Sequence, residues 1–319
     1  MIYKRSYLAS IERSFEEANE AMQTLTNALI NGVQLTLSEG RFLGGFLEIA
    51  QTDNPEFLDN LYDQLPGYHF WQLYLKYAQD INGEGGILTP YGYVTQEQKI
   101  LDAGFLDGIY QDWRPFVYKL KHKYTELQFL TSEARKDMKA TLDFNQRIGA
   151  GSRRMKVIEK TLVLHSKFVF SKIEEYYQEY ELKKDTINLC GKEVVVDSYT
   201  YAHVGIRHMA PWAKFGRTDK TCHSAEIDIN NLPRVILNFI EDYEHYMGCV
   251  NFDERRIYFR YKNRNNVIKL EELSRPTKGG ALMSYLRVQS FYPAELREDA
   301  ERVNNLTLTM VSDDLGFYS

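Results

Sequence analysis

Apolar side chains recur at steps of three and four positions along the first 180 residues of the chain. Between Leu8 and Leu29 this spacing predicts one long helix with an apolar side. Asn54-Pro55 favours a second helix over residues 55–65, and the glycine-rich residues 82–90 predict a loop. The helical pattern then continues, with a break at residues 149–152. The first half of the chain is therefore predicted to be all-helical.

The pattern changes after residue 184, where β-branched residues replace helix formers. Residues 186–196 predict a hairpin, and residues 232–243 predict a helix. Further strands are expected over residues 248–252, 255–262, 265–270 and 281–292. We expect an α+β fold in which a twisted antiparallel sheet packs on one or two helices. Two domains are predicted: a helical one over residues 1–184 and a small α+β one over residues 185–319.

Composition narrows the class of protein. Of the 319 residues, 44% are hydrophobic and 26% are charged, which is typical of a folded globular protein rather than a disordered one. The net charge of −5 argues against a protein coated in nucleic acid. Residues 255–278 nevertheless carry eight cations and two acids, which permits a local basic cleft.

Cysteine usage and the absence of long apolar runs bear on the compartment. No run of 18 apolar residues occurs, so neither a membrane-spanning helix nor a membrane partner is expected. Cys190, Cys222 and Cys249 are odd in number and lack CxxC spacing, and the N-terminus lacks the apolar core of a signal peptide. We therefore expect a soluble, cytoplasmic protein of a reducing compartment.

The segment Tyr199–His208 is the main candidate for chemistry. If it is helical, His203 and Arg207 are four residues apart and share a face, and His208 lies further round the helix. An imidazole can move protons near neutral pH and a guanidinium can bind phosphate oxygens in pairs, so this combination suits a phosphodiester. The structural alternative is a surface turn with a capping histidine and an ion-paired arginine.

Two further segments combine cations with aromatic rings, as a surface for unpaired nucleic acid does. One is residues 212–223, and the other is residues 255–262, where cations and a tyrosine alternate onto one strand face. The candidate RNA-binding residues are Trp212, Lys214, Arg217, Arg256, Arg260 and Lys262. A solvated loop around buried rings and a charged outer sheet face are the structural alternatives.

Residues 281–293 show the strongest strand pattern in the chain. Alternation places Tyr285, Arg287 and Gln289 on one face, from which they could reach a cleft, and Tyr292 lies beyond them. A central strand with one solvated face accounts equally well for this pattern.

Two short motifs, taken in order, resemble a known superfamily. The first is His-Val-Gly-Ile-Arg-His, ending at His208, and the second is Leu-Arg-Val-Gln-Ser-Phe-Tyr-Pro, ending at Pro293. Together with the helix over residues 232–243 and the basic strands, they resemble the barnase/EndoU/colicin/RelE-like (BECR-fold) metal-independent RNases. The versions found in phage and mobile elements are the most similar. The resemblance covers residues 185–293 and leaves the helical half without a counterpart.

The resemblance implies an endoribonuclease effector of the toxin or anti-phage (abortive-infection) type. Such an enzyme cleaves RNA by attack of a ribose 2′-hydroxyl on the adjacent phosphate, without a metal ion or another cofactor, and tRNA is among the candidate targets. The residues that match the two motifs are His203, Arg207, His208, Arg287, Ser290 and Tyr292. Ser290 stands where the family usually has a threonine, which keeps the hydroxyl group.

The implied mechanism assigns roles to several side chains. His203 or His208 would take the proton of the 2′-hydroxyl, and the other histidine or His223 would protonate the leaving 5′-oxygen. The charge of the phosphorane would be stabilised by Arg207, Lys220 and Arg287. The helical half would bind a trigger or neutralising protein, and its tyrosine-rich helices would suit a homodimer.

Two other classes of function are compatible with the sequence. A zinc-dependent hydrolase would take its ligands from His203, His208, Cys222, His223 and Cys249, although their spacing fits no standard zinc pattern. Stoichiometric zinc in the purified protein would favour that class. A non-enzymatic interaction protein, or a phage-associated structural protein, would use the basic strand and the tyrosine-rich helix as contact surfaces. Loss of partner binding on mutating that strand would favour it.

Overall fold

The structure of the chain is a computed structural model. It describes residues 1–11, 14–33, 35–36, 38–40, 42–43, 70, 73–74, 96–119, 121–179, 184–209, 215–223, 227–249, 252, 255–276 and 280–319. The helix predicted over residues 55–65, the loop predicted over residues 82–90, and the candidates Trp212 and Lys214 lie outside these residues.

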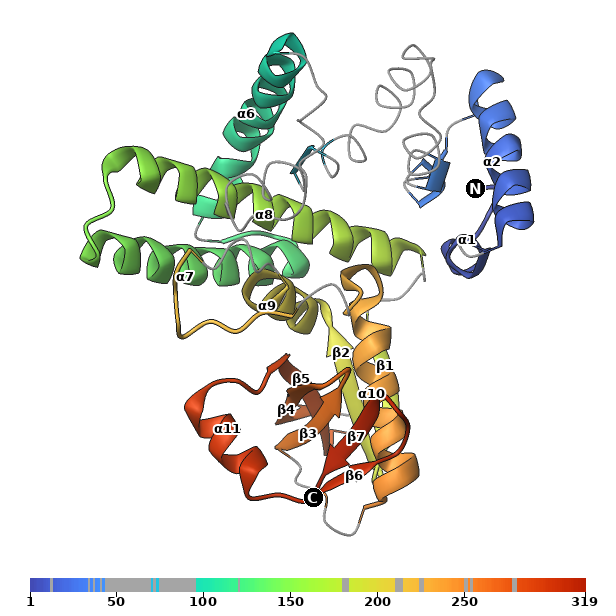
Figure 1. The fold of residues 1–319 in the computed structure, drawn as a ribbon. Coiled ribbons are helices and arrows are strands. Elements are labelled where there is room, and N and C mark those ends of the chain that lie inside the picture. The colour runs from blue at the N-terminus through green and yellow to red at the C-terminus, as the bar shows by residue number, and fades with distance from the viewer. Residues whose placement is uncertain are drawn as a thin grey trace.

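The elements described in the N-terminal half are helices, as the apolar spacing predicts (Figure 1). They are α1 (Arg5–Ile11), α2 (Phe15–Ile30), α6 (Gln96–Tyr118), α7 (Thr125–Arg147) and α8 (Ser152–Glu179). The single helix predicted between Leu8 and Leu29 is instead two helices, because the backbone is extended at Ser14, the N-cap position of the second helix, which has Glu16 and Glu17 in its first turn. The predicted break at residues 149–152 is confirmed, since it separates α7 from α8. In the described part of the chain, no helix combines the length and apolarity needed to cross a membrane.

The C-terminal half is built on a sheet, and the predicted α+β class is confirmed. Its helical elements are α9 (Ser198–His208), η3 (Ile229–Asn231), α10 (Leu232–Met247) and α11 (Arg297–Asn304). Its strands are β1 (Lys184–Leu189), β2 (Lys192–Asp197), β3 (Arg256–Tyr261), β4 (Arg264–Pro276), β5 (Leu282–Pro293), β6 (Leu308–Met310) and β7 (Leu315–Tyr318). Within the described residues they form one seven-stranded sheet in the order β1-β2-β5-β4-β3-β7-β6.

The sheet differs from the prediction in its pairing and in its edge. It is mostly antiparallel, but β2 and β5 run parallel, with Val194 opposite Leu286. Parallel neighbours need a crossover connection, and here the chain between β2 and β5 runs through α9, η3, α10, β3 and β4. The sequence pattern does not specify this connection. Of the predicted strand over residues 248–252, the described positions 248, 249 and 252 are not in a strand. The short elements α11, β6 and β7 were not predicted.

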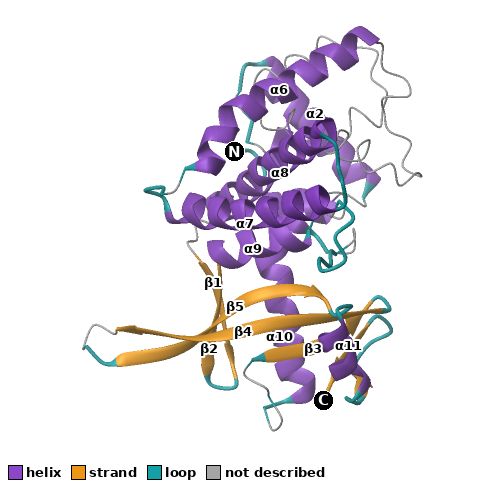
Figure 2. Ribbon diagram, turned by 90° about the vertical axis from the view of Figure 1, so that its left-hand side faces the viewer, coloured by secondary structure: helices purple, strands orange, loops and turns teal. Residues whose placement is uncertain are grey.

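The two faces of the sheet are covered by different helices, and we name each face after its helix (Figure 1). The α10 face belongs to the main core and carries Phe259, Ile268, Leu270, Val288 and Phe291. The α11 face carries a smaller cluster, which consists of Tyr258, Val267, Tyr292, Ala294 and Val303. Figure 2 shows the helical half stacked over the sheet, with α9 between the two.

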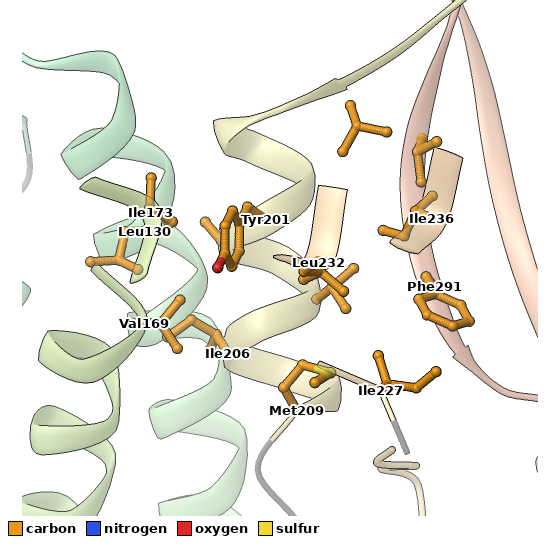
Figure 3. Close-up of a cluster of buried hydrophobic side chains, with 14 of the residues drawn as sticks. Leu130, Val169, Ile173, Tyr201, Ile206, Met209, Ile227, Leu232, Ile236 and Phe291 are labelled. Carbon is orange, nitrogen blue, oxygen red and sulfur yellow. The ribbon is translucent and has the colours of Figure 1, made fainter. Parts of the chain in front are cut away.

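One hydrophobic core runs from the helices into the sheet (Figure 3). Leu130 of α7 and Val169 of α8 lie on one side of it, Tyr201 of α9 lies in the middle, and Ile236 of α10 and Phe291 of β5 lie on the other side. The predicted boundary at residue 184 therefore marks a change of secondary structure, and the core is continuous across it.

Cys190 and Cys249 form a disulfide that the sequence spacing did not indicate. The bond joins the β1–β2 turn to the C-terminal end of α10, across a sequence separation of 59 residues. Cys222 is buried elsewhere in the core. Structural disulfides are rare in reducing compartments. This bond is therefore a point against the cytoplasmic compartment, which stays a prediction.

Breaking the disulfide is expected to destabilise the protein. A cross-link over 59 residues restricts the unfolded chain, and the chain-entropy model gives about 4 kcal/mol for a loop of this length. Dithiothreitol should lower the urea midpoint of the wild type and leave that of a Cys190→Ser/Cys249→Ser double variant unchanged. Equal wild-type midpoints with and without the reductant would contradict this expectation.

Candidate active site

Helix α9 carries the predicted histidines and is packed over most of its surface. Asp197 caps its first turn by accepting a hydrogen bond from the Thr200 N–H at 3.2 Å. Gly205 lies so close to α8 that a Cβ atom there would be 2.7 Å from a methyl carbon of Val169. The half-buried positions of the helix form one strip, made of Tyr199, His203, Arg207 and His208. The predicted shared face of His203 and Arg207 is thus confirmed.

His208 is the last residue of α9, and a hydrogen bond fixes the tautomer of its ring. Its Nδ1 lies 2.8 Å from the Thr221 carbonyl oxygen. Because a carbonyl oxygen only accepts, Nδ1 carries the hydrogen and Nε2 is the basic nitrogen of the neutral ring. Burial lowers the pKa of His208 well below its usual value, and the charge of His203 adds to this effect. Its ring stacks on Tyr292 with 5.0 Å between centroids.

His203 is bound by a carboxylate from the helical half. Its Nδ1 lies 3.0 Å from Oε2 of Glu133 on α7, and the Glu133 side chain is only 3% exposed. Burial by itself would raise the pKa of Glu133, but hydrogen bonds from His203 and Lys136 outweigh it and lower this pKa to about 2. Because a carboxylate oxygen only accepts, the His203 Nδ1 carries the hydrogen of this bond, and Nε2 remains for chemistry. The His203 and His208 ring centroids are 5.7 Å apart.

Strand β5 brings three predicted residues to the α11 face. In the strand register Ser290 lies opposite Lys269, and Arg287 lies opposite Glu271. The Arg287 guanidinium also donates to the Glu271 carboxylate at 2.7 Å. A bulge after Lys269 shifts the register, so that Arg287 and Ser290 share the face of Tyr292 although their numbers differ by three. The α11 face therefore presents two cations and a hydroxyl beside the two imidazoles of α9.

The contacts among these side chains form one continuous array. The Arg287 guanidinium lies 4.2 Å from the centroid of the Tyr199 ring, which in turn stacks on His203. At the other end the Lys269 ammonium lies 5.1 Å from the centroid of the Tyr292 ring. Among the described residues, several buried polar side-chain atoms have no hydrogen-bond partner, and Nε of Arg287 and Oγ of Ser290 are two of them.

The hydroxyl group of Tyr292 is already engaged. It donates to Oδ2 of Asp299 on α11 at 2.9 Å, and Asp299 also accepts from the Tyr258 hydroxyl at 2.8 Å. Burial, followed by the charge of Asp299, raises the pKa of Tyr292. The predicted catalytic Tyr292 therefore offers the face of its ring to His208 rather than a proton to a substrate.

Lys220 and Arg217, predicted for catalysis and RNA binding, are instead buried in an ion-pair cluster. Asp137 of α7 lies 2.8 Å from the Lys220 ammonium and 3.2 Å from the Arg217 guanidinium. Arg217 also donates to the Thr141 hydroxyl at 3.2 Å. The Lys220 and Arg217 side chains are 2% and 3% exposed. They attach the segment after α9 to α7, which corrects their predicted roles.

His223 and Arg207 have different environments. The His223 ring packs on Phe291, with 4.1 Å between centroids, and its Nε2 lies 3.2 Å from the Phe291 carbonyl oxygen. At 1% exposure, His223 is closed to a substrate in this structure. Arg207 lies on the half-buried strip beside His208, as the sequence predicts, and its catalytic role stays a prediction.

The basic strand β3 is less available to RNA than its sequence indicates. Arg256 pairs with Asp299 at 3.2 Å and with Glu298 at 3.3 Å, and Arg260 donates to Asn263 at 2.9 Å. Lys262 lies in the turn after the strand, not on its face. Acidic residues that are distant in sequence thus neutralise part of the positive charge of β3. A count of the charges over residues 255–278 alone does not reveal these partners.

The predicted zinc ligands do not come together. Cys249 is bonded to Cys190, and the Cys222 thiol lies 3.7 Å from the Arg207 carbonyl oxygen. Within the described ranges, the one group of three metal-binding side chains with neighbouring ligand atoms is Cys190, Glu244 and Cys249. Both sulfurs of that group are in the disulfide.

Three residues of the array were not predicted as site residues: Glu133, Tyr199 and Lys269. Glu133 lies 70 positions from His203 on a helix rich in charged residues, so local sequence does not single it out. Lys269 was counted only as one cation of a basic run. Alternation along β5 predicts that Arg287 faces the site. It cannot place Lys269 of β4 there, because that requires the register between β4 and β5.

Comparison of the chain with family models, with curated proteins and with solved structures found no match. The resemblance to metal-independent RNases therefore rests on the two sequence motifs. The chemistry of the site has to be argued from its geometry.

A buried histidine next to the site makes stability depend on pH. His165 of α8 is 1% exposed, and its Nε2 lies 2.9 Å from the Gly205 carbonyl oxygen. Its Nδ1 lies 2.9 Å from the Tyr74 hydroxyl, which therefore donates. Burial lowers the pKa of His165 to about 4, and the charge of Lys220 adds to the effect.

Acidification should therefore destabilise the protein. Between pH 6.5 and about 4 the unfolded state binds a proton at His165 that the native state does not, so the free energy of unfolding falls as the pH falls. At about pH 5 the loss from this residue is about 2 kcal/mol relative to neutral pH. His208 acts in the same direction, whereas the lowered pKa of Glu133 acts only below its ordinary value of 4.5.

Urea unfolding at several pH values measures this dependence. A His165→Gln variant should show a smaller slope of unfolding free energy against pH, whatever its absolute stability. A wild-type free energy that stays constant from about pH 7 to about pH 5 would contradict the assignment.

Proposed function

We propose that this chain is an endoribonuclease that cleaves RNA without a metal ion, by attack of a ribose 2′-hydroxyl on the adjacent phosphate. The observation that carries the proposal is the meeting of His203, His208, Lys269 and Arg287 on one side of the sheet. Two imidazoles and two cations are the groups that proton transfer and a phosphorane anion require.

His208 is the general base in this proposal. Its Nδ1–H is held by the Thr221 carbonyl, so Nε2 is unprotonated in the neutral ring. Burial keeps the ring neutral over a wide pH range. Nε2 therefore takes the proton of the 2′-hydroxyl, and the 2′-oxygen forms a bond to phosphorus.

His203 is the general acid. Its Nδ1 is bound to the carboxylate of Glu133, which leaves Nε2 as the nitrogen that donates a proton when the ring is charged. As the bond from phosphorus to the 5′-oxygen breaks, that oxygen takes the Nε2 proton. The products are a 2′,3′-cyclic phosphate end and a 5′-hydroxyl end. Because one histidine must be neutral and the other charged, the rate should have a bell-shaped pH dependence.

Lys269 and Arg287 would hold the phosphate. The ammonium and guanidinium groups offset the charge of the phosphorane. The Arg287 guanidinium also holds the Glu271 carboxylate at 2.7 Å, so a bound phosphate would share it with that acid. The Ser290 hydroxyl and the Arg287 Nε–H are buried and closed to a substrate in this structure, so the role of Ser290 stays a prediction.

The biological setting follows from the motif resemblance and belongs to the same proposal. Such an enzyme would be a cytoplasmic toxin or anti-phage effector that acts on RNA, with tRNA among the candidate substrates. The helical half would then be the place where a trigger, a neutralising protein or a second copy binds.

Incubation of the purified protein with total RNA and with tRNA, in EDTA, tests the chemistry. We expect cleavage that leaves 2′,3′-cyclic phosphate ends. His208→Asn should lower the rate at least about 100-fold, because the Asn amide can still donate to the Thr221 carbonyl but offers no base.

His245→Asn is the matched control, since His245 is exposed on α10, away from the array. It should cleave RNA at the wild-type rate. Cleavage that EDTA abolishes would favour metal-dependent hydrolysis. RNA binding without any cleavage would favour a non-enzymatic interaction protein. Either result would overturn the proposal.

A further inference from the structure

We propose that the helical half supplies part of the active site, because Glu133 of α7 is a positioning residue for His203 and cleavage therefore requires α7 docked on α9. This inference rests on the proposed nuclease function and deepens it. It makes the helical half a structural component of the site and not only a place where a partner binds.

The geometry of the contact is that of a carboxylate that orients an imidazole. Glu133 Oε2 lies 3.0 Å from His203 Nδ1, and the two side chains are 3% and 13% exposed. A carboxylate accepts only, so it holds the hydrogen on Nδ1 and turns Nε2 to the other side of the ring. Removing such an orienting partner typically costs an active site a factor of 10–100, by the precedent of metal-bound histidines.

Glu133 is itself held in place. Lys136 lies one turn along α7 and binds Oε1 at 2.7 Å, so each carboxylate oxygen has one partner. The remaining groups near His203 are the Tyr199 ring and the His208 ring on its own helix. The Arg287 guanidinium of β5 contacts the Tyr199 ring, and that ring stacks on His203. Glu133 is therefore the one acidic group in direct contact with His203 among the described residues.

The docking of α7 is reinforced beyond this contact. Asp137 and Thr141 follow Glu133 at four-residue steps on the same side of α7, and both are buried. They hold Arg217, and Asp137 also holds Lys220, in the segment after α9. A displacement of α7 would break these bonds together with the one to His203. A protein that binds the helical half and moves α7 would therefore switch off the site.

The test uses the full-length chain and a Glu133→Gln variant, which keeps the shape of the side chain and removes its charge. We expect kcat to fall about 10-fold or more with KM unchanged, since the substrate does not contact Glu133. Glu133→Asp restores the carboxylate and should recover part of kcat.

Asp143→Asn is the control, because Asp143 is an exposed carboxylate on the same helix. It should leave kcat and KM unchanged. If Glu133→Gln has the same kcat and KM as Asp143→Asn, the inference is wrong. A fall in kcat without a change in the tautomer of His203, in a variant that melts at a lower temperature, would indicate a merely structural role and would overturn it too.

Nitrogen-15 NMR of the histidine rings separates this inference from the proposed function. In the wild type the neutral form of His203 should carry its hydrogen on Nδ1, and in Glu133→Gln the two tautomers should mix. This readout requires no RNA cleavage. If the protein does not cleave RNA but the tautomer changes, the nuclease proposal fails and the positioning by Glu133 stands. If the tautomer does not change, the positioning fails whatever the activity.

Discussion

A row of buried polar side chains along α7 determines how the two halves of the chain meet. Glu133, Asp137, Thr141 and Asn145 recur every four residues and are all buried, so one side of this helix is both polar and closed to solvent. All four bond to α9 or to residues 215–223. A buried polar group without a partner is costly. Docking of α7 is therefore most favourable in the register that satisfies all four.

The position of α9 follows from this docking. The helix is packed against α7 and α8 on one side and against β5 on the other, and its apolar residues join a core common to both halves. What remains is a half-buried strip that carries the two histidines. The partners of these histidines differ in charge, since His203 meets a carboxylate and His208 meets a carbonyl. The two rings, with centroids 5.7 Å apart, therefore have different hydrogen-bond partners, and the opposite proton transfers proposed for them rest on that difference.

Local patterns were sufficient for much of the fold and for part of the site. The hairpin over residues 186–196, the helix α10 and the break between α7 and α8 depend on turn residues and periodicity, which neighbouring positions supply. The order of the two motifs also pointed to His203, His208, Arg287 and Ser290. These four lie near one another because α9 and β5 are neighbours, a contact that periodicity alone does not predict.

The failures share a physical cause, which is interaction over long sequence distances. The parallel pairing of β2 with β5 requires knowledge of the crossover. Lys220 and Arg217 look like surface cations in a loop, but Asp137, some 80 positions earlier, makes them part of the interior. The contact of Glu133 with His203 could not be predicted for the same reason, because the two residues are 70 positions apart. A polar side of a helix is normally exposed, and only the tertiary structure shows that this one is buried.

A double-mutant cycle between Glu133 and His203 tests the central claim that α7 and α9 are joined through this contact. The free energies of unfolding of Glu133→Gln, His203→Gln and the double variant would be compared with that of the wild type in urea at neutral pH. The account predicts a coupling of about 1–3 kcal/mol, because each single variant leaves a buried partner behind. If the losses of unfolding free energy in the two single variants add up to that of the double variant within about 0.3–0.5 kcal/mol, the two side chains do not interact, and the account is contradicted.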